Sequence, residues 1–154
     1  MNAYHSTALF VSDIKASQTF YREVLELEPI EDNGLHLAYK GFALWDKTMA
    51  DQLIFGKSQE KKSGGMELVL ECDQLEMFWE RIANHLSVIT PLNAQPWGQL
   101  AVRVSDPDGH TIGLYEPFWQ LIGRLRDQGM DDDDISRTTS IPIERLSLYE
   151  KAKS

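Results

Sequence analysis

The chain has 154 residues, of which 42% are hydrophobic and 25% are charged, and its formal net charge is −9 at pH 7. A chain of this length is one domain, or one domain with an appendage, and it can bury a core without disulfides or metals. The negative charge argues against duplex DNA or an anionic membrane as the main partner, because both need a basic surface.

No apolar run is long enough to span a bilayer, and the N-terminal residues lack the pattern of a signal peptide. We therefore expect a cytoplasmic protein with no membrane partner. Cys72 is the only cysteine, so no intramolecular disulfide can form, which suits a reducing compartment. It alternates with Leu68 and Leu70, which predicts a small core residue rather than a nucleophile.

The first half of the chain is predicted to fold as a strand, a helix and about three strands. Residues 6–12 alternate in polarity and predict the first strand, and Asp13 then stands as an N-cap before a helix. The apolar stripe of that helix consists of Ile14, Ser17, Phe20, Tyr21, Val24 and Leu25. Residues 31–34 predict a hairpin turn, followed by strands over 35–39 and 42–45.

The same order repeats after a polar, Gly- and Ser-rich linker at 58–64. Residues 67–72 predict a strand, Asp73 is expected to cap a helix, and a strand is expected around 88–89. Each half exposes one apolar sheet face and cannot be stable alone. We therefore expect the halves to lie side by side as a curved sheet, with helices on the outer face and a concave cup on the other.

The most specific signal is a predicted hairpin over residues 100–117. Apolar residues alternate with polar or small ones on both sides of its turn. The turn sequence, Asp106-Pro107-Asp108-Gly109, combines a fixed φ at proline, a carboxylate that bonds nearby backbone, and a glycine that tolerates positive φ.

Over residues 4–117 the chain resembles the vicinal oxygen chelate superfamily, which includes glyoxalase I, the extradiol dioxygenases, and the fosfomycin and bleomycin resistance proteins. The segments that carry the resemblance are FVSDIKASQTFYREVLELEP, ELVLECDQLEMFWERI and PWGQLAVRVSDPDGHTIGLYEP. The resemblance implies an α+β fold of two tandem βαβββ modules, at about 1–57 and 65–117, with residues 118–154 as a helical extension. It leaves the chemistry open, because this scaffold carries unrelated reactions and metal-free binders.

Metal-dependent members of the superfamily place one ligand on each of four cup strands. The corresponding positions in this chain are Ser6, Trp45, Glu67 and Gly113. A hydroxyl, an indole, a carboxylate and a glycine do not form a standard transition-metal site, so we expect no cofactor. The alternative is a divalent metal ion held by Glu67 and by His5, if a one-residue bulge turns His5 into the cup, with further ligands from a partner chain or a substrate.

Other side chains on the expected cup face suit a small aromatic or anionic ligand. The candidate ligand-binding residues are Ser6, Phe10, Trp45, Glu67, Trp97, Arg103 and Tyr115. Trp45 and Tyr115 offer flat apolar surfaces, Arg103 offers a fork for a carboxylate or phosphate, and Trp97 could stack on a ligand at the cup mouth. In the structural alternative Arg103 pairs with Glu67, Trp45 fills an empty cup, and Trp97 packs against a partner subunit.

Two histidines, His36 and His110, lie on or next to the predicted strands. The side of the sheet that His36 faces is not settled by the pattern, and we expect a structural or rim position for it. His110 follows the turn glycine, where a polar residue is common, and is expected to face solvent.

Residues 118–154 predict three short helices. Gly129 closes the first, the acidic run at 131–134 begins the second, and Pro142 lies near the start of the third. The arrangement is similar to a helix-turn-helix unit, but its acidic excess argues against DNA binding. The apolar stripe of the first helix is expected to cover the sheet rim or a second subunit, and its members are Trp119, Leu121, Ile122 and Leu125.

Three functions stay open at this point. The first is a metal-free small-molecule binding protein of the bleomycin-resistance type. The second is a metal-dependent lyase or ring-cleaving dioxygenase of the glyoxalase I or extradiol type, and the third is a regulatory protein that acts through the helical tail. The resemblance also implies a homodimer.

Overall fold

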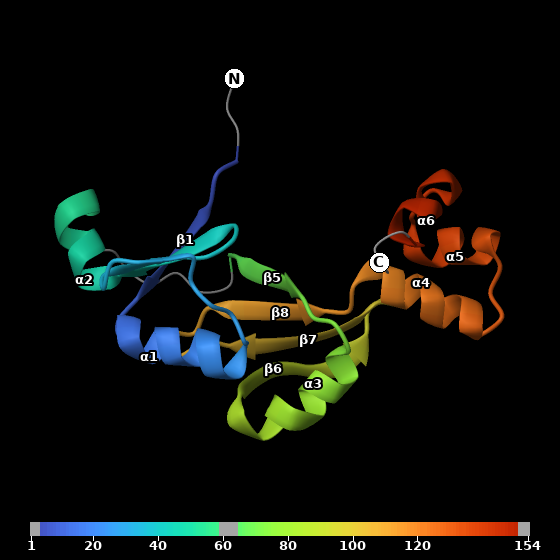
Figure 1. The fold of residues 1–154 in the computed structure, drawn as a ribbon, viewed down its shortest axis with the longest axis horizontal. Helices are drawn as coiled ribbons and strands as arrows, with labels where there is room; N and C mark the ends of the chain where they lie inside the picture. The colour runs from blue at the N-terminus through green and yellow to red at the C-terminus, as the bar shows by residue number, and fades with distance from the viewer. Residues whose placement is uncertain (1–3, 59–64, 151–154) are drawn as a thin grey trace. The chain divides into compact units, whose positions relative to one another are not determined.

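The computed structural model describes residues 4–58 and 65–150 of the chain (Figure 1). The chain divides into two compact units, Met1–Glu67 with Ser105–Thr111, and Leu68–Val104 with Ile112–Ser154. Apart from Ser58, the predicted linker lies outside the described residues. Two mixed four-stranded sheets form, and each has the strand order first, fourth, third, second, which confirms the tandem βαβββ modules.

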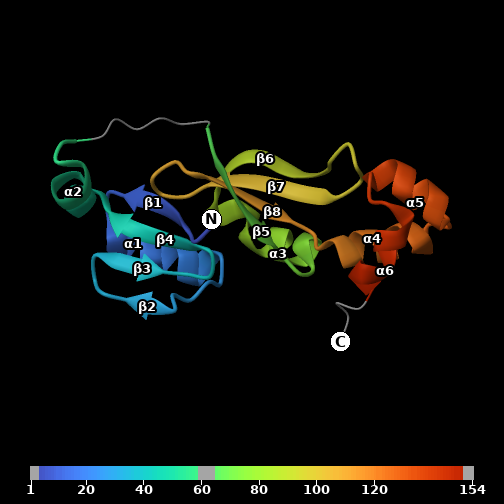
Figure 2. The same cartoon turned by 90° about the horizontal axis from the view of Figure 1, so that it is seen from above.

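The first sheet has the order β1-β4-β3-β2 (Figure 2). Its strands are β1 (Thr7–Val11), β2 (Glu31–Asp32), β3 (His36–Ala38) and β4 (Phe42–Asp46). β1 pairs with β4 in parallel, and β3 pairs with both β4 and β2 in antiparallel fashion. Leu9 and Val11 are buried on one face of β1, whereas Ala8 and Phe10 lie on the other, as the alternation predicted.

The helix after β1 begins where the sequence predicts. The Asp13 carboxylate accepts hydrogen bonds from the backbone N–H groups of Lys15 and Ala16 at the start of α1 (Ile14–Thr19). The helix then widens into a π-helical turn, η1 (Phe20–Val24). Tyr21 is fully buried on the predicted apolar stripe and packs against the rings of Tyr39 and Phe42.

Two elements of the first unit were not predicted. They are α2 (Lys47–Ala50), which follows β4 directly (Figure 2), and the π-helical turn η2 (Asp51–Phe55) after it. Asp46 caps α2, because its carboxylate accepts a hydrogen bond of 2.8 Å from the Met49 N–H. This Asp-x-x-Met start was a signal in the sequence, but the segment is too short for an apolar period to stand out.

The second sheet has the order β5-β8-β7-β6. Its elements are β5 (Glu67–Glu71), α3 (Leu75–Ile82), the 3₁₀ turn η3 (Ala83–His85), β6 (Ser87–Ala94), β7 (Leu100–Ser105) and β8 (Thr111–Tyr115). Asp73 was predicted to cap α3, but it does not. The turn after β5 is one residue longer than the spacing suggested, so Gln74, at φ +55°, is the N-cap and makes no side-chain capping bond.

The predicted turn between β7 and β8 is confirmed. The Gly109 N–H donates to the Asp106 carbonyl at 3.0 Å, and Gly109 has a φ of +84°, which a glycine adopts without strain. The Asp106 carboxylate bonds the backbone N–H groups of Asp108 and His110, as an aspartate at the start of a turn does.

The hairpin tip belongs to the first unit and is fixed there by polar contacts. The Asp106 side chain is completely buried, and its Oδ2 accepts a hydrogen bond of 3.1 Å from the Tyr21 hydroxyl and lies 2.8 Å from His110 Nδ1. The prediction that His110 faces solvent is therefore incomplete. Its ring pairs with the Asp106 carboxylate, which needs partners because it is buried. Beside this cluster, Asp108 accepts hydrogen bonds from both the N–H and the hydroxyl of Ser12.

Removing the hydroxyl group should have opposite effects on stability at the two buried tyrosines of this unit. Tyr21 donates to Asp106, whereas the Tyr39 hydroxyl is buried with no hydrogen-bond partner among the described residues. Replacing Tyr39 with phenylalanine should therefore leave the free energy of unfolding at pH 7 unchanged or raised, and replacing Tyr21 should lower it by about 1–2 kcal/mol. Urea denaturation of the two matched variants tests this, and a larger loss for the Tyr39 variant would contradict it.

The same residues predict a loss of stability at alkaline pH. Burial raises the pKa of Tyr39 to about 12, with Glu28 and Asp32 adding to the rise, and burial and then Asp106 raise the pKa of Tyr21. The unfolded chain then releases these protons first, so their contribution is complete below about pH 10 and is lost as pH rises through the folded pKa. The Tyr39→Phe variant should lose stability less steeply between about pH 10 and 12.

Residues 118–154 form the predicted helices, as far as the structure describes them. They are α4 (Phe118–Asp127), α5 (Asp132–Thr139), which Asp131 caps, and α6 (Ile143–Glu150). Gly129, at φ +86°, follows the first of them as expected. None of the helices in the described part of the chain combines the length and apolar character that a membrane crossing requires.

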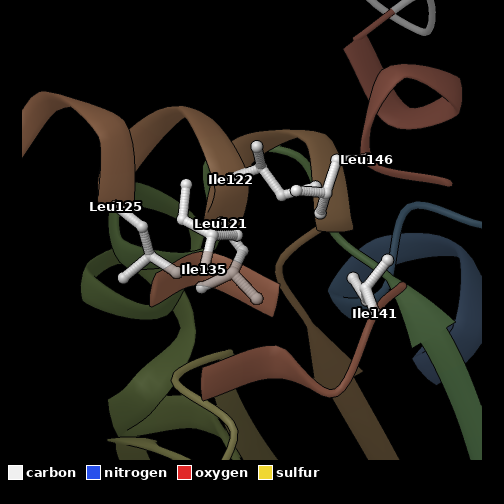
Figure 3. Close-up of a cluster of buried hydrophobic side chains, with 6 residues drawn as sticks. All are labelled: Leu121, Ile122, Leu125, Ile135, Ile141 and Leu146. Carbon is white, nitrogen blue, oxygen red and sulfur yellow. The ribbon is translucent and has the colours of Figure 1, made fainter. Parts of the chain in front are cut away.

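The three helices enclose a small hydrophobic core of their own (Figure 3). Its buried members are Leu121, Ile122, Leu125, Ile135, Ile141 and Leu146. The first three belong to the stripe that was expected to cover a sheet rim or a second subunit. They are buried in the core of the extension, because α5 and α6 fold back against α4, and Leu121 also lies close to Gly98 in the loop before β7.

Candidate functional site

The open face of the first sheet carries a cavity of about 740 Å³. The strand register explains the hollow. Ala8, Ala43 and Ala38 stand opposite one another on β1, β4 and β3, and all three line the cavity. The next row, Leu9, Leu44 and Leu37, is buried on the other face of the sheet. A row of alanines therefore leaves open space where larger side chains would fill it.

A row of rings stands beside the alanines. Phe10 pairs in register with Trp45, and Trp45 pairs with His36. The His36 and Trp45 rings meet edge to face with centroids 4.4 Å apart, and both residues line the cavity. The Phe10 ring is held from the side by the ring of Phe55, at 5.3 Å. His36 and Trp45 therefore give the cavity a half-buried aromatic wall, and Phe10 stands next to Trp45 outside the lining.

Sequence reasoning missed His36 as part of this wall. The signal was the spacing His36, Ala38 against Leu37, Tyr39, which puts the histidine on the face opposite to the core once Leu37 is recognised as buried. The strand is only three residues long, so the alternation alone did not decide its facing.

The segment just before β1 contributes polar groups to the same cavity. His5 and Ser6 both lie in its lining, although strict alternation would send one of them to the other face. Tyr4 fixes this segment, since its hydroxyl donates to the Gly41 carbonyl at 2.8 Å and contacts the Thr7 hydroxyl. Lys40 and Glu31 complete the charged part of the lining.

Three further candidates lie in the second unit. The guanidinium of Arg103 donates to the Tyr115 hydroxyl at 2.5 Å and to Gln95 Oε1 at 3.3 Å, and it lies 5.5 Å from the centre of the Tyr115 ring. Trp97 donates its indole N–H to Gln99 Oε1 at 2.8 Å. Arg103 and Tyr115 therefore form one polar cluster.

The candidates thus fall into two groups. Ser6, Phe10 and Trp45 gather on the first sheet, and the Arg103 cluster and Trp97 lie in the second unit. Glu67 is the half-buried first residue of β5. The meeting of these groups in one cup stays a prediction.

The side chains present do not fit the divalent metal that the resemblance allows. Of the four positions expected to carry ligands, Gly113 has no side chain and Trp45 presents an indole. Among residues 4–58 and 65–150, no three His, Cys, Asp or Glu side chains are grouped so that they could hold a metal ion. His5 and His36 both line the cavity, but two imidazoles fall short of the three protein ligands usual in a catalytic zinc site.

Comparison with known protein families agrees with this architecture. Residues 4–118 match the family described as Glyoxalase-like domain, and the match ends where α4 begins. The chain belongs to this family. A comparison with curated proteins gave no match.

Several solved structures share the fold. A protein of unknown function from Agrobacterium tumefaciens str. C58 has 34% identity and a TM-score of 0.67, over 75% of this chain and 94% of that one. A glyoxalase-related enzyme from Fulvimarina pelagi has 23% identity and a TM-score of 0.61, over 74% and 88%. A member of the glyoxalase/bleomycin resistance protein/dioxygenase superfamily from Sphaerobacter thermophilus DSM 20745 has 24% identity and a TM-score of 0.56, over 75% and 98%. The last two likenesses concern the fold alone.

Proposed function

We propose that the chain binds a small aromatic or anionic molecule in the cavity over its first sheet, without the help of a metal ion. The observation that carries the proposal is the pairing of an alanine floor with an aromatic wall. Ala8, Ala38 and Ala43 leave a hollow of about 740 Å³, and His36 and Trp45 present their rings beside it. A volume of this size suits a drug-sized ligand, which such pockets bind mainly through apolar surface.

Polar groups at the edge of the cavity support a ligand that carries negative charge. His5, His36 and Lys40 can each donate a hydrogen bond from nitrogen, whereas Glu31 is the only carboxylate in the described lining. An aromatic acid would use both features, with its ring against Trp45 and its acid group toward these nitrogens. Arg103 of the second unit stays a predicted ligand-binding residue, because its guanidinium suits a carboxylate or phosphate.

The test uses anilinonaphthalene sulfonate, an aromatic anion whose fluorescence reports binding. We expect saturable binding to the native protein, and we expect a Trp45→Leu variant to bind about tenfold more weakly, because the ring contact is lost. Trp79→Leu is the matched control, since Trp79 is a half-buried indole on α3 in the other unit. Equal weakening by both variants, or none by Trp45→Leu, would contradict the proposal.

The same titration separates the proposal from a metal-dependent lyase or dioxygenase. Native protein is dialysed against EDTA, and its metal content is measured before and after. We expect no stoichiometric divalent metal and the same probe affinity in both samples. A bound metal whose removal abolishes probe binding would favour the enzyme, with Glu67 and His5 as the first ligands to replace.

A further inference from the structure

The helical extension forms a direct hydrogen bond with the loop between β6 and β7. Arg124, in the middle of α4, donates from Nη2 to the carbonyl of Gly98 at 2.8 Å and to Glu116 Oε1 at 2.5 Å. The Glu116 carboxylate is almost fully buried, with 5% of its side chain exposed. A buried carboxylate requires a charged partner, so Arg124 is held at this position by more than packing.

Glu116 also accepts hydrogen bonds from the last residue of this loop and from the first residue of β7. The same Oε1 atom accepts the backbone N–H of Leu100 at 2.7 Å, at the start of β7. The Glu116 carbonyl accepts a hydrogen bond of 2.7 Å from the side-chain amide of Gln99, which is also buried. Glu116, the residue that follows β8, therefore joins the guanidinium of Arg124 to Gln99 and Leu100, where the loop enters β7.

Side chains of the loop form hydrogen bonds with two of the candidate ligand-binding residues, Trp97 within the loop and Arg103 on β7. Gln99 Oε1 accepts the indole N–H of Trp97, and Gln95 Oε1 accepts a hydrogen bond from Arg103. The backbone closes on itself between these side chains, because the Gly98 N–H donates to the Gln95 carbonyl at 2.8 Å. A movement of the loop would therefore move both Trp97 and Arg103.

The extension also packs against the loop backbone. A β-carbon at Gly98 would lie 3.6 Å from both Leu121 Cδ1 of α4 and Thr138 Cγ2 of α5. Gly98 has a φ of +87°, a conformation that side-chain-bearing residues rarely adopt. The loop thus takes its shape in direct contact with two helices of the extension.

We propose that Arg124 is a positioning residue, through which the helical extension sets the conformation of residues 95–99 and thereby the places of Trp97 and Arg103. The effect on ligand affinity rests on the function proposed above, but the effect on the loop does not. Arg124 then supports the binding site from a segment that follows the family match, which ends at residue 118.

Hydrogen exchange in the full chain tests the effect on the loop. In Arg124→Met we expect the amides of Gly98 and Leu100 to exchange at least about tenfold faster, and the amide of Val102, within β7, to keep its rate. Arg124→Lys keeps the positive charge but replaces the planar guanidinium with an ammonium group, so it should accelerate the same two amides by less than Arg124→Met. Arg126→Met is the matched control, because Arg126 is on the same helix and pairs with exposed Asp132.

Two results would overturn the proposal. One is unchanged exchange at Gly98 and Leu100 in both Arg124 variants. The other is equal acceleration at Val102, which would indicate general destabilisation rather than positioning. These outcomes need no ligand, so they are distinct from a failure of the binding function.

Binding of anilinonaphthalene sulfonate tests the consequence for the site. We expect Arg124→Met to lower the affinity for the probe several-fold and Arg126→Met to leave that affinity unchanged. If the native protein does not bind the probe, the proposed function is contradicted while the exchange rates still decide the positioning role. If the native protein binds it and Arg124→Met binds it equally well, the extension does not position the site.

Discussion

Replacing Asp106 with alanine is expected to lower the free energy of unfolding by about 3–5 kcal/mol. The carboxylate accepts hydrogen bonds from the Tyr21 hydroxyl and from the backbone N–H groups of Asp108 and His110, and it also contacts the His110 ring. Alanine would leave the buried Tyr21 hydroxyl and the half-buried groups of Asp108 and His110 without their acceptor, and the Tyr21 hydroxyl would keep the cost of its lost hydration in full.

Urea denaturation measures this effect, with Asp133→Ala as the control. Asp133 is an exposed aspartate in the first turn of α5, so its removal should change stability by less than about 0.5 kcal/mol. Tyr21→Phe removes one donor and leaves the rest, so its loss should be clearly smaller than that of Asp106→Ala. A loss below about 1 kcal/mol for Asp106→Ala would mean that the hairpin tip is not held by this carboxylate.

The sheets and turns of this fold could be predicted because their signals are local. Alternation over five or six residues marks β1, β7 and β8, and the Asp106 to Gly109 turn has its chemistry in four consecutive residues. The repeat of strand, helix and strands then follows from comparing the two halves. The cap of α3 was placed one residue early because a turn can lengthen without changing the residue types around it.

The cavity could not be predicted in the same way, because it depends on strand register. Ala8, Ala43 and Ala38 are unremarkable in sequence and form a floor only when β1, β4 and β3 align them. His36 became part of the wall for the same reason, through its pairing with Trp45. Register between strands far apart in sequence is set by packing of the whole sheet, which no short window contains.

Contacts across long sequence separations were missed in the hairpin tip and in the extension. The bond from Tyr21 to Asp106 joins residues 85 positions apart, and Arg124 reaches back 26 positions to Gly98. The apolar stripe of α4 was recognised correctly, but a stripe does not specify what covers it. The strand residues of the predicted site follow from the face of the sheet on which alternation places them, whereas Trp97 lies in a loop, where alternation gives no signal for the hydrogen bond to Gln99.

Replacing Leu121 with alanine is expected to lower the free energy of unfolding by about 2–5 kcal/mol. Leu121 is fully buried in the core of the extension, beside Ile135 and Leu125 (Figure 3), and a β-carbon at Gly98 would lie 3.6 Å from its Cδ1. Alanine would therefore open a cavity where the extension meets the loop before β7, and the loop should lose support together with the helices.

Leu148 on α6 provides the matched control, because it is a leucine of the same extension with 60% of its surface exposed. Leu148→Ala should change the free energy of unfolding by less than about 0.5 kcal/mol. Urea unfolding followed by both tryptophan fluorescence and far-ultraviolet circular dichroism makes the comparison. Coincident transitions that shift together in Leu121→Ala are expected if the extension and the second sheet unfold as one unit. Contacts between the extension and the second sheet should couple the stabilities of the two parts. An early transition seen only by circular dichroism, with an unshifted fluorescence transition, would instead show that the extension folds on its own.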